Sequence, residues 1–543
     1  MDQSIKRIKD VSDSLVDLII SILENRFFFL FIVVINLYPI ISNSFFATLD
    51  GASHLYNAKI IDELINNQTS LSNSFFKFNS YIVPNCISHY IILFFLKFMP
   101  LWALEKSLLI VYLISLPIAF RYFSSSLNTN KIYSYFVLPF TFSFFFFLGF
   151  FNFIIGLSIF FGGLGYFYKN LNKNSFTKYL TLFIFSFLIY LSNPFLLVIW
   201  MVSLYILLLY NTIQAYLINK ALSYNSNIKH IIFTSISLLP VIILSLHYLL
   251  IQAPTVLLRN HFFELIKWIA KIRVLISLNE NYEYRFTYYL FFVFIVFGLS
   301  IIFNFINKKN RKETFFSFKK SIPIIIISSI LLFLYFFLPD QMAQGAYVSS
   351  RIILMFFFFI IVFFSFFKVN KYILISTLIL MFCIHFKLMD YHTKVMKPLN
   401  KCAEEIFECN KIIKDNSTVL CVNKTGNWMQ DHLSNYAGFG KGVILSDNYE
   451  AYMGNFPILW KENSFKKYKF FLETSNDNLK PSIINLNNFI QSNSDYILIY
   501  GVYPLNSSGL ESEISKVLEF DYNLEYKSSN GFVKLYKLRK YSN

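Results

Sequence analysis

The chain has 543 residues, of which 56% are hydrophobic and 15% are charged, and its formal net charge is +17. Soluble domains usually contain about 25% charged residues, so the composition excludes a single soluble enzyme, a disordered chain, a collagen-like fibre and a disulfide scaffold. It predicts a polytopic α-helical membrane protein.

The charge is divided unevenly along the chain. Residues 1–389 carry a net charge of +16, whereas residues 390–543 are rich in charges of both signs and carry +1. We therefore expect three parts: a cytoplasmic interfacial helix over 1–26, a multi-span membrane domain over 27–389, and a soluble domain over 390–543. Because most of the positive charge lies in the membrane part, where it sets topology, we expect no nucleic-acid partner.

In chain order, the first 26 residues place apolar side chains near helical spacing between charged ones, and no small-residue cleavage site follows. This pattern is typical of a helix on the membrane surface rather than a signal peptide. The first span is predicted at 27–46. Eleven further apolar runs of spanning length follow, at 81–99, 104–121, 132–148, 151–168, 178–192, 194–216, 230–251, 285–306, 321–338, 351–367 and 372–389.

The most basic loop, residues 308–320, is expected in the cytoplasm together with the N-terminus. The loop 47–80, the segments 252–284 and 339–350, and the soluble domain then lie outside the cytoplasm. An N-terminus inside and a C-terminus outside require an odd number of spans, so we expect eleven or thirteen rather than twelve. The runs least certain to be separate spans are those between 132 and 192. The localisation predicted is the plasma membrane, in bacteria the inner membrane.

The soluble domain is predicted to be a compact α/β domain outside the membrane. Apolar residues at helical spacing indicate helices near 399–414, 484–493 and 510–519. The expected strands are Val419 to Asn423, Gly442 to Ser446, Tyr496 to Val502, and a terminal hairpin of Tyr522 to Tyr526 with Phe532 to Leu538.

Directly after the first span, Asp50 stands four residues before His54. On a helix beginning at Asp50 the two side chains would lie over the same face. A carboxylate and an imidazole at the membrane edge suit general base catalysis, and they could also hold a divalent cation. A simple helix cap followed by an interfacial polar residue is the alternative, and spacing alone favours it.

Several basic residues are predicted on the outer side of the membrane, although basic residues usually gather in cytoplasmic loops. Arg259 and Lys267 lie in the segment 252–284, where Lys267 belongs to an expected interfacial helix, and Arg351 begins a late span. They could bind a lipid phosphate, although attraction to bulk anionic lipid and snorkelling of the arginine explain them as well. Tyr347, before Arg351, and Asn152 are candidates to line a substrate cavity, and helix-to-helix hydrogen bonding is the alternative for Asn152.

The arrangement resembles the GT-C superfamily of membrane glycosyltransferases, which use polyprenyl-phosphate sugars. In that family, a cytoplasmic N-terminus and one span lead to an outside loop with a catalytic acid and then to an amphipathic helix along the membrane. Asp50 stands at the position of the acid and Gly51 to Ile65 at that of the helix, and residues 390–543 match the terminal domain in place and size. Members often carry paired acids in this loop, whereas here one acid is followed by His54.

The resemblance implies an inverting transfer of a sugar from a polyprenyl-phosphate donor to a lipid, glycan or protein acceptor in the lipid bilayer. Asp50 and His54 would be catalytic, and Arg351, Arg259 and Lys267 would bind the donor phosphate. Because Asn427 to Asp431 only faintly matches the Trp-Trp-Asp signature of oligosaccharide transferases, a monosaccharide transferase similar to protein mannosyltransferases or aminoarabinose transferases is favoured. A transporter or lipid flippase, or a surface-polysaccharide polymerase or ligase, are the alternatives.

Overall fold

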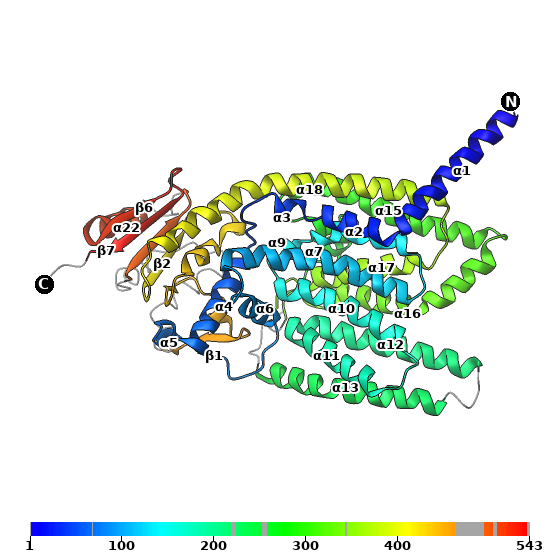
Figure 1. The fold of residues 1–543 in the computed structure, drawn as a ribbon, viewed down its shortest axis with the longest axis horizontal. Helices are drawn as coiled ribbons and strands as arrows, with labels where there is room; N and C mark the ends of the chain where they lie inside the picture. The colour runs from blue at the N-terminus through cyan, green and yellow to red at the C-terminus, as the bar shows by residue number, and fades with distance from the viewer. Residues whose placement is uncertain are drawn as a thin grey trace. The chain divides into compact units, whose positions relative to one another are not determined.

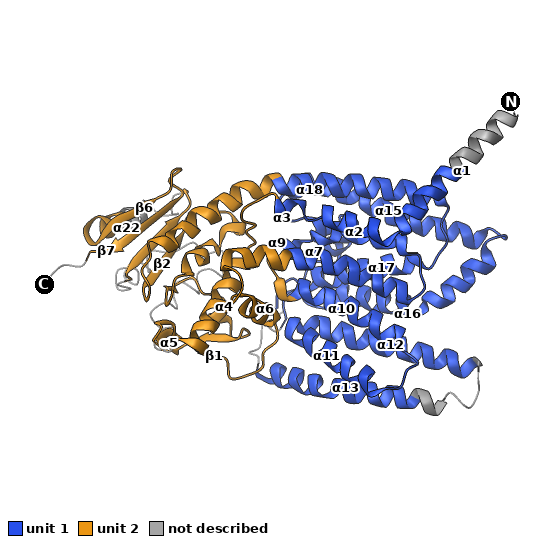
Figure 2. Cartoon of the chain, viewed as in Figure 1, with its two compact units in different colours: residues 1–41, 110–147, 153–393 blue, residues 42–109, 148–152, 394–543 orange. Residues whose placement is uncertain are grey.

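The computed structural model describes residues 2–67, 69–218, 224–251, 258–342, 345–462, 494–502 and 508–539. Most of them are helical (Figure 1). The chain divides into two compact units, which are coloured separately in Figure 2. Residues 1–41, 110–147 and 153–393 form a helical unit, and residues 42–109, 148–152 and 394–543 form a mixed unit.

Long apolar helices dominate the chain, as the hydropathy of the sequence predicts. Among the described residues, eight helices are long and apolar enough to cross a membrane, and a pair bent by 72°, Asp13–Glu24 with Arg26–Ile41, would make a ninth. The protein is therefore a polytopic helical membrane protein. The eight are α7 (Leu101–Ser126), α10 (Phe151–Lys169), α12 (Pro194–Ile218), α13 (Tyr224–Ile251), α15 (Glu280–Ile306), α16 (Arg311–Phe337), α17 (Val348–Ser365) and α18 (Lys371–Phe407).

Four of the predicted spans do not form single helices of spanning length. The first, at 27–46, contains a ten-residue and a four-residue helix, which would cross a membrane only as part of the bent pair. The run 81–99 contains only the nine-residue helix α6 (Ile87–Phe95), and the helix at 178–192, α11 (Phe176–Ser192), has 17 residues. The run 132–148 is divided into a 3₁₀ helix (Lys131–Val137), α8 (Leu138–Thr141) and α9 (Phe144–Phe147). The expectation of eleven to thirteen spans is therefore too high for the described residues, because apolar composition does not reveal where a run is broken.

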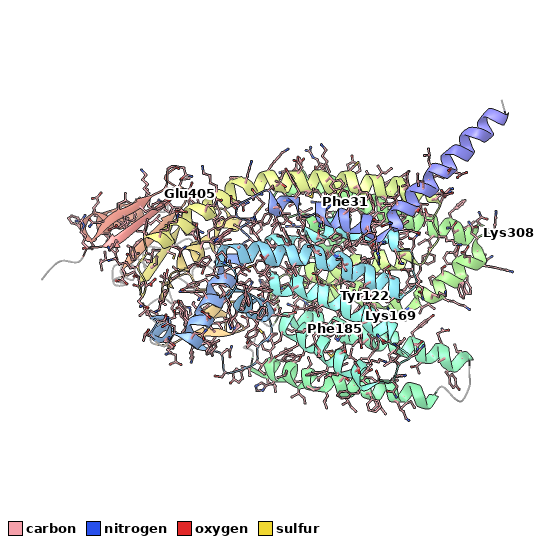
Figure 3. All side chains as sticks on the ribbon, viewed as in Figure 1. Phe31, Tyr122, Lys169, Phe185, Lys308 and Glu405 are labelled. Atoms are coloured by element: carbon pink, nitrogen blue, oxygen red, sulfur yellow. The ribbon has the colours of Figure 1, made fainter. Side chains whose placement is uncertain are left out.

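Side-chain amides and hydroxyls fix several helix starts. Asn25 accepts hydrogen bonds at the start of α2 (Arg26–Ile35), which precedes α3 (Tyr38–Ile41), and Ser175 and Asn279 do so for α11 and α15. Each satisfies a backbone N–H that has no partner inside its helix. Figure 3 shows Phe31 and Tyr122, exposed apolar side chains of the kind a bilayer would cover, and Lys308, exposed in the basic connection between α15 and α16.

The mixed unit contains a five-stranded sheet in the order β3-β2-β5-β7-β6. The strand β2 is parallel to β3 and β5, and β7 is antiparallel to β5 and β6. Leu420 and Ile497 of this sheet pack with Leu518 and Tyr522. The bounds are β2 (Thr418–Asn423), β3 (Ile444–Leu445), β5 (Tyr496–Tyr500), α22 (Ser508–Asp521), β6 (Tyr522–Lys527) and β7 (Val533–Leu538).

The α/β character of the C-terminal residues and their terminal hairpin are thus confirmed. The helix predicted at 399–414 is the end of α18, which continues to Phe407, and the one predicted at 484–493 lies outside the described residues. A second sheet was not predicted: β1 (Phe76–Phe78) pairs antiparallel with β4 (Ile458–Trp460). Its strands are about 380 residues apart in the sequence, so the first loop and the C-terminal residues form one compact unit.

The helix after Asp50, α4 (Gly51–Asn66), is a buried helix of the mixed unit. Every side chain from Ala52 to Ile61 is buried. The Tyr56 hydroxyl donates to Val443 O (3.0 Å) and accepts from Leu445 N (2.9 Å). The amphipathic surface helix that the GT-C resemblance implies at this position is therefore not observed, because C-terminal residues cover the face that would otherwise meet lipid or water.

Candidate functional site

Asp50 occupies the N-cap position of α4, but its side chain makes no capping hydrogen bond. Its backbone is fixed instead: Asp50 N–H donates to Leu148 O (3.0 Å), and His54 N–H donates to Asp50 O (3.0 Å). The residue is 8% exposed. The carboxylate is consequently not used to cap the helix, which was the main alternative to a chemical role.

The residues before Asp50 are held by a buried carboxylate. Glu105 Oε1, in the first turns of α7, accepts hydrogen bonds from Thr48 N (3.0 Å) and Thr48 Oγ1 (2.8 Å), and its other oxygen accepts one from the Tyr436 hydroxyl. Ala47 N donates to Asn400 Oδ1 (2.9 Å). Contacts from several parts of the chain thus fix the position of Asp50 before any ligand binds, as a catalytic group requires.

We predict that Gly149→Ala will destabilise the protein strongly. Gly149 has φ +69°, and a Cβ at this position would lie 2.3 Å from Thr48 Oγ1 and 2.9 Å from Gly51 N. The left-handed backbone and the clash should together lower the free energy of unfolding by roughly 2–4 kcal/mol. Thermal unfolding of the detergent-purified protein measures this loss.

Gly454→Ala is the matched control, since Gly454 has φ +76° but a Cβ there would meet nothing within 4 Å. It should show only the conformational cost, about 1–2 kcal/mol. Equal destabilisation by the two substitutions would contradict the close approach at Gly149.

The imidazole nearest the Asp50 carboxylate belongs to His432, not to His54. His432 Nε2 lies 3.9 Å from Asp50 Oδ1, and its Nδ1 lies 3.7 Å from Asp447 Oδ1. The His432 ring stacks on Tyr449 at a centroid distance of 4.3 Å. The sequence-based pairing of Asp50 with His54 is therefore replaced by an Asp50–His432–Asp447 arrangement.

The charges at this site are set by burial and by one another. Burial raises the pKa of Asp50 above its ordinary value, and the positive charges of His432 and His54 and a hydrogen bond from Tyr449 oppose that rise. Burial alone would lower the pKa of His432, but the Asp447 and Asp50 carboxylates raise it to about 9. At neutral pH the site thus holds a carboxyl group with raised proton affinity beside an imidazolium ion.

A second group of buried side chains lies next to Asp50. His54 Nδ1, from α4, is 2.8 Å from Glu450 Oε1, and His89 Nε2, from α6, is 2.9 Å from Glu450 Oε2. Glu450 begins α19 (Glu450–Met453), and its Oε2 also accepts a hydrogen bond from Asn57 Nδ2 (2.8 Å). Burial would raise the pKa of Glu450, but the two histidines lower it to about 2.

This second group is sheltered from water. The rings of Phe151 and Phe456 have centroids 5.4 Å and 6.2 Å from that of His54. The side chains of His89 and Glu450 are 0% exposed, and that of His54 is 5% exposed. Burial lowers the pKa of His89, an effect that Glu450 only partly offsets, whereas Glu450 raises the pKa of His54 against the effect of burial.

Asn152 makes two hydrogen bonds to backbone. Its Oδ1 accepts from Ser88 N (2.7 Å) and its Nδ2 donates to Asn85 O (2.8 Å), with a 5% exposed side chain. It therefore fixes the start of α6, and with it the position of His89. Its predicted role in a substrate cavity remains a prediction.

Arg351 and Tyr347 belong to the helical unit. Arg351 lies in the first turn of α17, with its guanidinium 5.2 Å from the ring centroid of Phe153. Tyr347, just before the helix, has φ +59°, and its ring meets Phe144 at 5.2 Å. Such a backbone conformation costs roughly 1–3 kcal/mol in a residue other than glycine, so the turn leading to Arg351 is held by its surroundings.

Arg259 and Lys267 are exposed residues of the helical unit. Lys267 lies on the short helix α14 (Phe262–Ala270), which buries Leu265 and exposes Phe262 and Phe263. An amphipathic helix with exposed aromatic and basic side chains agrees with the predicted interfacial helix. The predicted site residues are thus divided: Asp50, His54 and Asn152 belong to the mixed unit, and the four others to the helical unit.

Comparison of the sequence with models of known protein families and with curated proteins finds no match.

Sequence reasoning missed the residues that surround Asp50. His432, Glu450 and Glu105 stand in no motif, and the chain brings the first two to α4 from nearly 400 residues away. His89 lies inside the apolar run 81–99 and stands in no motif either. The one available signal was chemical: histidines are rare in this chain, with eight in 543 residues, and three of them meet carboxylates in the mixed unit.

Proposed function

We propose that the protein is a membrane glycosyltransferase that moves a sugar from a polyprenyl-phosphate donor to an acceptor on the extracytoplasmic face, with inversion at the anomeric carbon. The observation that carries the proposal is the Asp50 carboxyl group. It directly follows the first apolar segment, is almost fully buried, is not used as a helix cap, and has a raised pKa beside a cationic histidine.

In this mechanism Asp50 is the general base. Its carboxylate takes the proton of an acceptor hydroxyl while the hydroxyl oxygen attacks the anomeric carbon of the donor sugar. The bond from that carbon to the phosphate oxygen breaks, and its electron pair remains on the polyprenyl phosphate. A raised pKa brings Asp50 closer to the operating pH, which makes proton transfer more efficient.

Cationic groups would stabilise the phosphate as it leaves. Arg351 suits this role because its planar guanidinium can make two parallel hydrogen bonds to phosphate, and the rings of Phe145 and Phe153 lie beside it. Lys267, on the amphipathic α14, and Arg259, in the segment before that helix, could meet the lipid phosphate. Since His54 faces Glu450 rather than the Asp50 carboxylate, we assign it to supporting the site.

The proposal includes a GT-C-like topology with a cytoplasmic N-terminus and an extracytoplasmic C-terminal domain in a plasma or bacterial inner membrane. The exposed basic connection around Lys308 would face the cytoplasm. The acceptor would be a lipid, a glycan or a protein reached from the membrane surface.

The test is sugar transfer by the purified full-length protein in lipid nanodiscs. Radiolabelled polyprenyl-phosphate sugars are supplied with an extract of cell-envelope lipids and glycans, and both the labelled product and the released polyprenyl phosphate are measured. We expect one sugar added per acceptor. Long product chains would support a polymerase, and movement of labelled lipid across liposomes without a covalent product would support a flippase.

A further inference from the structure

The group formed by His54, His89 and Glu450 has the geometry of ligands around one metal ion. Each residue offers one ligand atom, and these atoms lie within 4.8 Å of one another. The two imidazole nitrogens that face each other, His54 Nδ1 and His89 Nε2, are 3.4 Å apart. Two ligands bound tetrahedrally at ~2.0–2.1 Å from a zinc ion would be separated by ~3.3 Å.

Hydrogen bonding alone accounts poorly for this arrangement. If both nitrogens donated protons to Glu450, the two N–H groups would face each other across 3.4 Å. Moreover, Glu450 Oε1 has no properly aligned hydrogen-bond donor within the described part of the chain, although His54 Nδ1 is only 2.8 Å away. A central cation would instead attract all three lone pairs at once.

The ligand types select the class of metal. Two imidazoles and one carboxylate form a donor set typical of zinc and similar first-row divalent ions, whereas Mg²⁺ and Ca²⁺ prefer oxygen ligands. The three residues come from α4, α6 and α19, and Asn57 holds the carboxylate oxygen that faces His89. A hydrogen bond to a ligating carboxylate of this kind is common around metal centres.

We propose that His54, His89 and Glu450 bind one zinc-class divalent ion, with one enclosed water molecule as its fourth ligand. The ion would join three segments of the mixed unit one helical turn from Asp50. The proposal does not depend on the sugar-transfer reaction, because it rests on the ligand geometry alone.

The experiment measures metal content without any donor or acceptor. The full-length protein is purified in detergent through an affinity tag without histidine, and its zinc is counted by mass spectrometry. We expect about one equivalent per chain. After chelation, titration with Co²⁺ alone should produce the visible absorption of a four-coordinate site, and chelation should lower the thermal midpoint by several degrees, as loss of a ligand bound to the native state requires.

Glu450→Gln and His89→Gln should lose the bound zinc and the Co²⁺ absorption. His432→Gln, at the neighbouring imidazole outside the group, is the matched control and should keep both. Because a variant could fail to fold, the wild-type protein supplies the deciding measurement. The proposal would be overturned if the purified wild-type protein contained no zinc, kept its thermal midpoint when treated with a chelator, and did not bind Co²⁺ afterwards. The three side chains would then form a hydrogen-bonded cluster. Sugar transfer by a protein that binds no metal would overturn the metal site and leave the proposed function intact. Metal binding by a protein that transfers no sugar would do the opposite.

Discussion

Replacing Asp50 with asparagine is expected to reduce sugar transfer by at least ~10²-fold, the lower end of what general base catalysis contributes. Asparagine has nearly the same shape as aspartate, but its amide cannot accept the acceptor's proton. The backbone bonds of residue 50 to Leu148 and His54 do not involve the side chain. The variant should therefore fold normally, and its initial rate with labelled donor measures the loss directly.

Asp62→Asn provides the control on the same helix. Asp62 is only partly buried and accepts a hydrogen bond from the exposed Asn66 side chain (2.8 Å), so its loss should leave the rate within about twofold of the wild type. Full activity of the Asp50 variant in a protein that retains its thermal midpoint would end the assignment of Asp50 as the base.

Hydropathy predicted most of the fold because each long apolar helix satisfies its own backbone hydrogen bonds and needs only length and composition to be recognised. It failed where the chain breaks an apolar run. At 132–148 the chain forms three short helices, and Gly149 then adopts a positive φ and approaches Thr48. That break brings Leu148 O to Asp50 N–H, so the feature that confused the span count helps to build the site.

Asp50 could be singled out because the signal is local, namely one acid a few residues after the first apolar run. Its partners could not, because they depend on tertiary contacts. His432 and Glu450 are brought to α4 by the pairing of Tyr56 with residues 443 and 445 and of β1 with β4. For the same reason the GT-C resemblance implied an amphipathic helix along the membrane at Gly51 to Ile65, whereas C-terminal residues bury α4.

Replacing His432 with glutamine should also reduce sugar transfer strongly. In the wild type, an imidazolium ion beside Asp50 favours the charged carboxylate that a general base needs. Glutamine is similar in size but carries no charge, so the pKa of Asp50 should rise further in its buried site. We expect the acidic limb of the pH–rate profile to move to higher pH, and the rate at pH values on that limb to fall about tenfold for each unit by which the pKa of Asp50 rises.

The same substitution also tests whether His432 is protonated in the folded protein, because protonation makes the free energy of unfolding depend on pH. The groups that face this imidazole are the carboxylates of Asp50, Asp447 and Asp431 and the ring of Tyr449. Because the folded pKa of about 9 exceeds the unfolded value of about 6.5, protonation stabilises the native state fully below pH ~6.5 and progressively less as pH rises through ~9.

Unfolding measured from pH 6 to pH 10 should therefore show a loss in the wild type, on the order of 3 kcal/mol at most, that the variant lacks. His261→Gln, at an exposed histidine, should retain the wild-type pH dependence. Parallel stability curves for wild type and His432→Gln would mean that His432 is neutral in the folded protein, and Asp50 would then need another source of positive charge to act as a base at neutral pH. An unchanged acidic limb in the same variant would lead to the same conclusion from the kinetics.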